Sequence, residues 1–92
     1  MSAGDVMQGR RLPPEARDFA AGDYQQMADG RGWNIRPPRG HLGWLSTDPG
    51  HHTVVEHEDG TITAAPSILH TSARDGSVIW HGFLERGVWR EV

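Results

Sequence analysis

The stretch of sequence that decides the fold is Thr53-Val54-Val55-Glu56-His57-Glu58-Asp59-Gly60-Thr61-Ile62-Thr63-Ala64. Two runs rich in β-branched residues flank Asp59-Gly60, a dipeptide that favours a two-residue hairpin turn. This turn length predicts that His57 opposes Ile62 and that Val55 opposes Ala64, all on one face of the hairpin. The other face then carries two glutamates opposite two threonines. One apolar and one polar face result, so the predicted register is self-consistent.

Two further turns follow at short spacing. Asp75-Gly76 predicts a second two-residue hairpin, in which His70 and His81 oppose each other across the strands. Residues 85–87 form a third turn, of two or three residues, before the last predicted strand at 88–92. Strands that return on themselves at such short intervals indicate an antiparallel sheet or a small barrel.

The first half of the chain carries weaker signals. Residues 1–12 show no periodicity and are predicted to form a flexible N-terminal arm. Residues 12–20, with early prolines and acids, are compatible with one short helix. Strands are expected at 24–27, 32–36 and 40–45, the last with a bulge. The predicted fold is therefore mainly β: a single domain over 13–92, an antiparallel meander, sandwich or barrel with at most one short N-terminal helix.

Composition limits the available chemistry. The 92 residues include 12 glycines and 6 prolines, but no cysteine and no lysine. Disulfides, cysteine nucleophiles, Cys-type zinc sites and Schiff-base lysines are excluded. The net charge of −3 comes without a clustered basic face or a dense acidic run, so nucleic acid is not an expected partner. No apolar stretch has the length of a membrane span or a signal-peptide core, and we expect a cytoplasmic protein.

Six histidines are the main chemical feature. The predicted register makes His70 and His81 cross-strand neighbours, and two imidazoles at that separation can chelate one zinc ion if a third ligand such as His41 completes the site. The alternative is that the two rings stack across the sheet without a metal. No Gly-x-Ser-x-Gly elbow accompanies the serines near His70, so no enzyme activity is expected.

Tryptophan and arginine residues are the second feature. Trp33 and Trp80 are predicted to lie in the core, because a tryptophan supplies a large buried area to a small β domain. Exposed tryptophans next to arginines are instead typical of protein-binding hot spots. The candidate partner-binding residues are Trp44, Trp89, Arg90, Arg31, Arg36 and Arg39.

The second half also resembles a known family. The motifs that carry the resemblance are Pro66-Ser67-Ile68-Leu69 and the closing run Trp80-His81-Gly82-Phe83-Leu84-Glu85-Arg86-Gly87-Val88-Trp89-Arg90. They are similar to those of a family of small phage and prophage proteins with no assigned function, which implies a small β-rich accessory protein. Wider relatives carry cysteines near the positions of 37–42 and of the closing histidine and look like zinc-binding proteins. This chain has none, although His41 and His81 match positions near those sites.

These features together favour binding over catalysis. We expect a non-enzymatic, phage-type accessory protein in the host cytoplasm that binds a larger host or phage protein. Inhibition of a host defence complex such as a CRISPR effector is one expected form of this function, by analogy with other small phage proteins. The alternative is a zinc-binding domain that uses the histidines named above. A homodimer formed through an exposed edge strand is compatible with either function.

Overall fold

The computed structural model describes residues 6–47 and 52–92. Over these residues the chain forms two β-sheets and no helix, which confirms the predicted mainly β fold. The strands are β1 (Val6–Gln8), β2 (Arg10–Arg11), β3 (Asp23–Gln26), β4 (Gly32–Ile35), β5 (Gly43–Ser46), β6 (Thr53–Glu56), β7 (Ile62–Thr71), β8 (Val78–Glu85) and β9 (Val88–Glu91).

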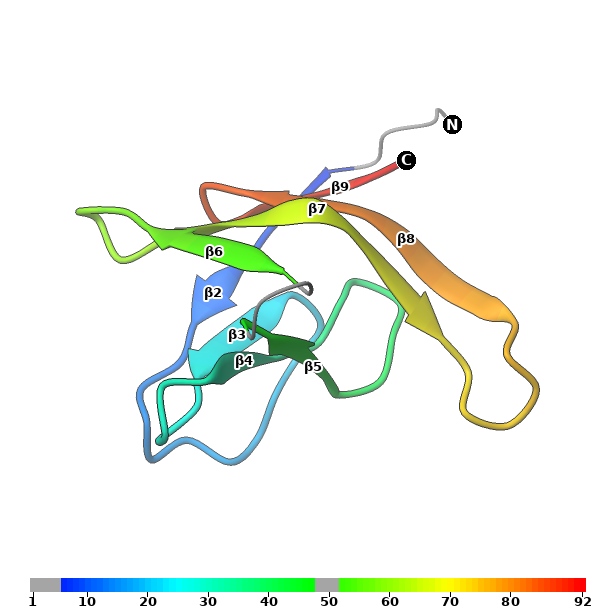
Figure 1. The fold of residues 1–92 in the computed structure, drawn as a ribbon, viewed down its shortest axis with the longest axis horizontal. Coiled ribbons are helices and arrows are strands. Elements are labelled where there is room, and N and C mark those ends of the chain that lie inside the picture. The colour runs from blue at the N-terminus through cyan, green and yellow to red at the C-terminus, as the bar shows by residue number, and fades with distance from the viewer. Residues whose placement is uncertain (1–5, 48–51) are drawn as a thin grey trace.

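The first sheet has five antiparallel strands in the order β1-β9-β8-β7-β6. The second has the order β2-β3-β4-β5 and is antiparallel except for the parallel pair β2 and β3. Figure 1 shows the four-stranded sheet lying on one side of the five-stranded sheet, with the long β7–β8 hairpin reaching beyond it. The face of the five-stranded sheet that points away from the four-stranded one is therefore left open.

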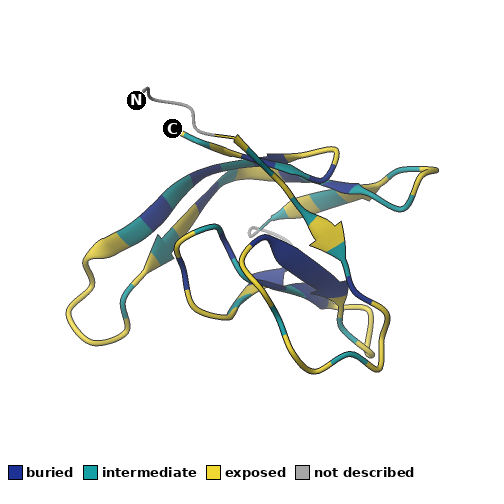
Figure 2. Ribbon diagram, turned by 180° about the vertical axis from the view of Figure 1, so that it is seen from behind, coloured by how far each residue is buried: buried dark blue, intermediate teal, exposed yellow. Residues whose placement is uncertain are grey.

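The core lies between the two sheets and is rich in aromatic side chains. Trp80 and Trp89 meet edge to face with ring centroids 5.4 Å apart, and Tyr24 lies 6.3 Å from Trp33. All four residues are at most 4 % exposed, which confirms the core assignment of Trp33 and Trp80. Figure 2 shows buried positions alternating with more exposed ones along the long strands, as the two-residue period of a strand requires.

The first hairpin differs from its predicted register by one residue. The backbone N–H of His57 donates to the carbonyl of Thr61 at 2.8 Å, so the loop has three residues and ends on Gly60 with φ 88°. A three-residue loop with a left-handed glycine is a common alternative to the two-residue turn. Glu56 therefore opposes Ile62, and Val55 points to solvent with 51 % of its surface exposed.

The second hairpin also has a longer loop than predicted. Ser72 N–H donates to the carbonyl of Ser77 at 2.8 Å, which leaves residues 73–76 in the loop. His70 consequently opposes Trp80, and His81 opposes Leu69. The prediction that the two histidines are cross-strand neighbours is wrong, because a shift of one residue moves a side chain to the other face of a sheet.

The third turn has two residues, within the predicted range. Glu85 opposes Val88, and the turn residues Arg86 and Gly87 both have positive φ angles, 47° and 77°. This geometry corresponds to the type I′ turn that suits the twist of two-stranded hairpins.

The N-terminal segment is more ordered than predicted. Residues 1–5 lie outside the described residues, but 6–11 form β1 and β2 where a flexible arm was expected. Gly9 lies between the two strands, and its N–H donates to the carbonyl of Gly87 at 2.7 Å. A Cβ on Gly9 would lie 2.6 Å from that oxygen, so only glycine lets the chain pass from one sheet to the other here.

The expected short helix over 12–20 does not form. The Gln25 side chain holds this segment instead, because its Nε2 donates to the backbone carbonyls of Pro13 and Ala16 at 2.8 and 2.9 Å. Those carbonyls are thus satisfied without α-helical hydrogen bonds, although the Pro13 carbonyl also accepts the Ala16 N–H in a single turn at 3.1 Å, and the segment covers the outer side of β3.

Candidate functional site

The three predicted zinc ligands do not converge. His41 and His70 are neighbours, since the backbone N–H of His41 donates to Nε2 of His70 at 3.2 Å. His81 points to the opposite face of the sheet, where its Nε2 lies 3.1 Å from Oγ of Ser67. In the part of the chain that the structure describes, no group of three His, Cys, Asp or Glu residues could hold a metal ion. The proposed ligand set is therefore wrong.

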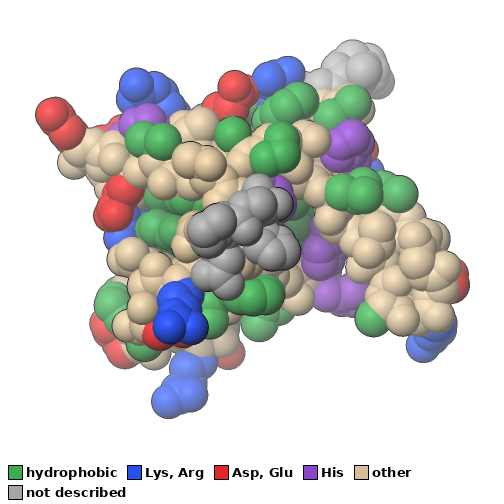
Figure 3. Space-filling view, in the orientation of Figure 1, with side chains coloured by type: hydrophobic (Ala, Val, Ile, Leu, Met, Phe, Trp, Pro, Cys, Tyr) green, Lys and Arg blue, Asp and Glu red, His purple; other side chains and the backbone are tan. Residues whose placement is uncertain are grey.

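His70 instead joins the two sheets. A Cβ at Gly40 would lie 2.6 Å from its Cδ2, and one at Gly43 would lie 3.0 Å from its Cε1, so the ring fits between two glycines. Burial, and to a lesser extent the charge of nearby His41, lowers the pKa of His70. Histidine side chains fill the notch between the β7–β8 hairpin and the rest of the molecule (Figure 3).

Trp89 was predicted as a partner-binding residue, and this is wrong. It is fully buried, and its indole N–H donates to the carbonyl of Gly22 at 2.8 Å. The alternation along β9 places Trp89 on the inner side with Leu84, its cross-strand partner on β8. Trp44, in contrast, is 57 % exposed on the outer side of the four-stranded sheet, where its ring lies close over Gly32.

The predicted arginines are dispersed and do not form one basic site. Arg36 donates to the carbonyl of Phe19, and Arg39 is paired with Glu91, whose pKa is lowered by that hydrogen bond. Arg31 is exposed beside the β4–β5 pair. Arg90 alone belongs to the open face of the five-stranded sheet.

The strand register of the five-stranded sheet determines which side chains lie on that open face. Trp80 and Leu84 of β8 point into the core, so His81, Phe83 and Glu85 point outward. Their neighbours across the strands point to the same side, and Val92 joins them because its N–H donates to the carbonyl of His81 at 3.0 Å. We call this surface the outer face. It comprises Val6, Gln8, Ser67, Leu69, His81, Phe83, Glu85, Val88, Arg90 and Val92.

The centre of the outer face is an arginine stacked on an aromatic ring. The guanidinium carbon of Arg90 lies 4.9 Å from the ring centroid of Phe83, directly across the β8–β9 pair. The same guanidinium donates to Glu85 at 2.8 Å. Two contacts hold the arginine flat, so little conformational freedom remains to be lost when a partner covers it.

Apolar side chains surround this centre. Val6, Leu69 and Val92 are 64, 57 and 61 % exposed, and they lie in adjacent rows of the same face. Figure 3 shows hydrophobic groups interleaved with charged ones over β7 to β9, along the top of the view. Contiguous exposed apolar side chains with a central aromatic and arginine are typical of protein-binding surfaces.

Sequence reasoning missed most of this face. Phe83, Leu69 and Val6 were not among the candidate residues, although Phe83 and Arg90 follow from the two-residue turn at Arg86-Gly87 once its length is known. The contribution of Val6 depends on the pairing of β1 with β9, for which the sequence carries no local signal.

The contact between Ser67 and His81 has the atoms of a nucleophile and a base. Ser67 has a second histidine neighbour, His52, whose Nε2 lies 3.3 Å from the Ser67 backbone carbonyl. A catalytic triad also needs a group that orients the imidazole. None of the described hydrogen bonds joins His81 to a carboxylate, and both residues lie on an open sheet rather than in a cleft.

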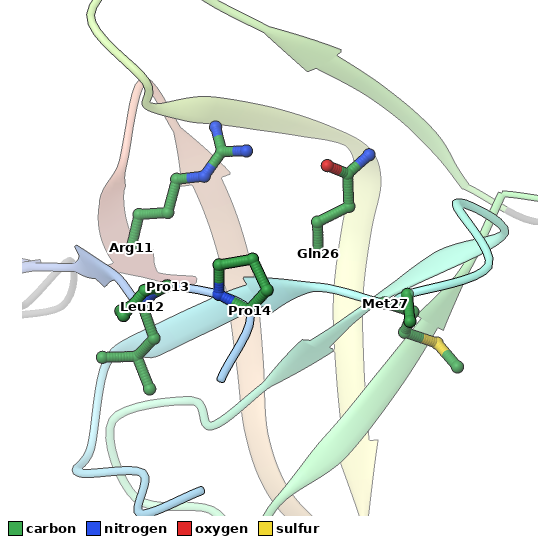
Figure 4. Close-up of a pocket in the computed structure, with 7 residues that line it drawn as sticks. Arg11, Leu12, Pro13, Pro14, Gln26 and Met27 are labelled. Carbon is green, nitrogen blue, oxygen red and sulfur yellow. The ribbon is translucent and has the colours of Figure 1, made fainter. Parts of the chain in front are cut away.

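A separate cavity of about 660 Å³ lies where the segment after β2 passes the end of β3 (Figure 4). Its lining residues are Arg11, Leu12, Pro13, Pro14, Gln26, Met27 and Ala28. Its one cation, Arg11, pairs with Glu56 at 2.6 Å and lies 5.0 Å from the Trp33 ring centroid. Arg11 is thus already engaged in holding the two sheets together.

No protein-family model matches this chain, and neither a curated protein nor a solved structure matches it. The resemblance to small phage and prophage proteins therefore stays a prediction. No helix that could span a membrane occurs in residues 6–47 and 52–92.

Proposed function

We propose that the protein is a non-enzymatic accessory factor that acts by binding a larger protein through its outer face. The observation that carries the proposal is the Arg90 guanidinium, held flat on Phe83 at the centre of an apolar surface. Arginine and aromatic residues at the centre of an interface supply most of its binding energy, and the surrounding residues exclude water. The outer face has this arrangement, with exposed aliphatic side chains around the stacked pair.

We propose that the larger protein belongs to a host defence complex, which this protein inhibits by binding to it. Its support is the similarity of the closing motif to phage proteins together with the small size of the chain. A small protein that occupies a functional surface of a larger complex needs no chemistry of its own, only affinity and shape.

Affinity capture from a lysate of the host, with wild-type protein and two variants, tests the proposal. The double variant Arg90→Glu with Leu69→Asp changes the outer face, whereas Trp44→Ala removes an equally exposed side chain from the other sheet. We expect one stoichiometric partner with the wild type and with Trp44→Ala, and none with the double variant. The proposal would be contradicted if no partner is captured while a positive control works. It would also be contradicted if the double variant captures the same partner as the wild type.

A further inference from the structure

The strands of the two sheets form a ring that is closed on one side and open on the other. The five-stranded sheet ends in β1, and a single residue, Gly9, connects β1 to β2 of the four-stranded sheet. The opposite ends of the two sheets are β6 and β5. A hydrogen bond from the N–H of His52 to the carbonyl of Ser46, at 3.1 Å, joins their near ends, but β5 and β6 are not paired with each other. Among the described residues, no strand therefore pairs with the second edge of β6.

The strand register determines which backbone groups lie on this edge. The N–H of His57 donates across the hairpin at 2.8 Å, and the residues that bond to the neighbouring strand alternate along an antiparallel pair. Val55 therefore bonds to β7, whereas Val54 and Glu56 direct their N–H and C=O groups away from it. His52, the next residue in this series, agrees, because its N–H donates to the other sheet. The edge thus presents a row of alternating donors and acceptors, which an extended chain can complement.

The residues of β6 leave this edge open to pairing. Sheet edges are commonly protected by a proline, a basic residue, a bulge or a charge that points inward. The strand Thr53-Val54-Val55-Glu56 has no proline or basic residue and pairs with β7 without a shift of register. Its one charge, on Glu56, is held by Arg11 at 2.6 Å. Val54 packs against the core, and Val55 is 51 % exposed on the opposite side. A strand along this edge would therefore meet an apolar side chain on each of its faces.

The acidic residues at the loop end of β6 favour a basic occupant. A hollow of about 500 Å³ lies there, lined by Glu56, His57, Glu58, Asp59 and Arg86. Hydrogen bonds from Thr61 lower the pKa of Asp59, so its carboxylate stays ionised at neutral pH. Three carboxylates thus meet two arginines, Arg86 in the hollow and Arg11 on Glu56. The remaining negative charge is complementary to a lysine or arginine of a bound segment.

We propose that the free edge of β6 binds an extended basic segment of a partner protein, which adds to the five-stranded sheet as a further strand. The backbone of this segment pairs with Val54 and Glu56. Its side chains alternate between the core side, beside Val54, and the solvent side, beside Val55. This edge is separate from the outer face around Arg90, so the inference does not rest on the proposed function.

Amide hydrogen exchange of the wild-type protein, followed by nuclear magnetic resonance, tests the proposal directly. In the free protein the amides of Val54 and Glu56 should exchange freely, whereas those of Val55 and His57 should be protected. The probe is the peptide acetyl-KVTVTVK-amide, which alternates in the required way and is basic. At about 10 mM it should slow exchange of the Val54 and Glu56 amides by about tenfold, as expected for a dissociation constant of about 1 mM. Protection of these two amides before peptide is added, or no slowing with it, would overturn the proposal.

Two substitutions at one position separate strand pairing from charge. Glu56→Pro removes the N–H that faces the free edge, which the ladder with β7 does not use. Glu56→Ala is the matched control, because it also loses the carboxylate and its contact with Arg11 but keeps that N–H. The proline variant should bind the peptide at least about tenfold more weakly than the alanine variant. Equal affinities of two variants with wild-type circular dichroism would contradict strand pairing, and the exchange experiment decides if the proline variant does not fold.

A second copy of the chain is the competing occupant of this edge. Sedimentation of the free protein should give 10.2 kDa at every concentration used for exchange. A mass that rises together with protection of the Val54 and Glu56 amides would mean that β6 pairs with another β6, and the proposal would be wrong. Capture of a larger protein through the outer face does not depend on this edge, so the two proposals can fail separately.

Discussion

Replacement of Trp89 by phenylalanine tests how the two sheets are held together. The indole spans the core: its ring meets Trp80 edge to face at 5.4 Å, and its N–H donates to the carbonyl of Gly22 at 2.8 Å. Phenylalanine keeps an aromatic contact but removes this hydrogen bond, which is worth about 1 kcal/mol. The smaller ring also leaves a cavity that adds about 1–2 kcal/mol.

The expected loss of unfolding free energy is therefore about 2–3 kcal/mol. It is not larger, because the Gly22 carbonyl keeps a second donor, the backbone N–H of Arg10 at 3.2 Å. For a domain of this size the loss corresponds to a midpoint about 2–3 M lower in urea, since the slope is about 1 kcal/mol per molar. Urea titration followed by far-ultraviolet circular dichroism measures this shift.

The matched control for this experiment is Trp44→Phe. Trp44 is 57 % exposed, so the same change of side chain should cost less than about 0.5 kcal/mol. An unchanged urea midpoint for Trp89→Phe, or an equal loss of stability in Trp44→Phe, would show that the Trp89 indole does not hold the two sheets together.

Three further substitutions test other parts of the fold. Because burial and the nearby charge of His41 lower the pKa of His70, the unfolding free energy should be highest above the unfolded-state value of 6.5 and fall as pH decreases through the folded-state pKa. Thermal unfolding of His70→Gln should show a weaker dependence on pH in this range, and an unchanged slope would contradict the assignment. Gly40→Ala should cost about 1–3 kcal/mol in urea titration, because its Cβ would lie 2.6 Å from the His70 ring, and little of that cost should remain when His70 is also alanine. Arg86→Asn should raise stability by about 0.5–1 kcal/mol, because asparagine tolerates the φ of 47° better than arginine and asparagine-glycine favours a type I′ turn; a lower melting temperature would refute this.

The sequence predicted where each hairpin turns, but for the first two it did not predict the number of residues in the loop. At Asp59-Gly60 the aspartate accepts a hydrogen bond from the backbone N–H of Thr61 at 2.9 Å, and at Asp75-Gly76 from that of Ser77 at 3.0 Å. Such local side-chain contacts stabilise loops of three or four residues as well as two, so the dipeptide alone cannot distinguish them. The position of each of these two turns was predicted correctly, but the predicted strand register was wrong by one residue in both hairpins.

That displacement explains why the candidate site was largely wrong. A slip of one residue exchanges the inner and outer faces of a strand, and it moved His81 away from His70. The zinc site required both on one face. Trp89 failed for a related reason: the sequence left the third turn at two or three residues, and only the two-residue turn places Trp89 opposite the buried Leu84.

The pairing of β1 with β9 has a consequence for how the protein forms during synthesis. Val6 opposes Arg90, so β1 is synthesised well before β9, the strand with which it pairs. Until then the segment around Gly9, which ties the two sheets together, has neither the Gly87 carbonyl nor the Trp89 indole beside it. Contacts this distant in the chain close slowly. The nascent protein therefore leaves the apolar side of this sheet exposed to chaperones until β9 has left the ribosomal tunnel, and the contacts at Gly9 form only after that.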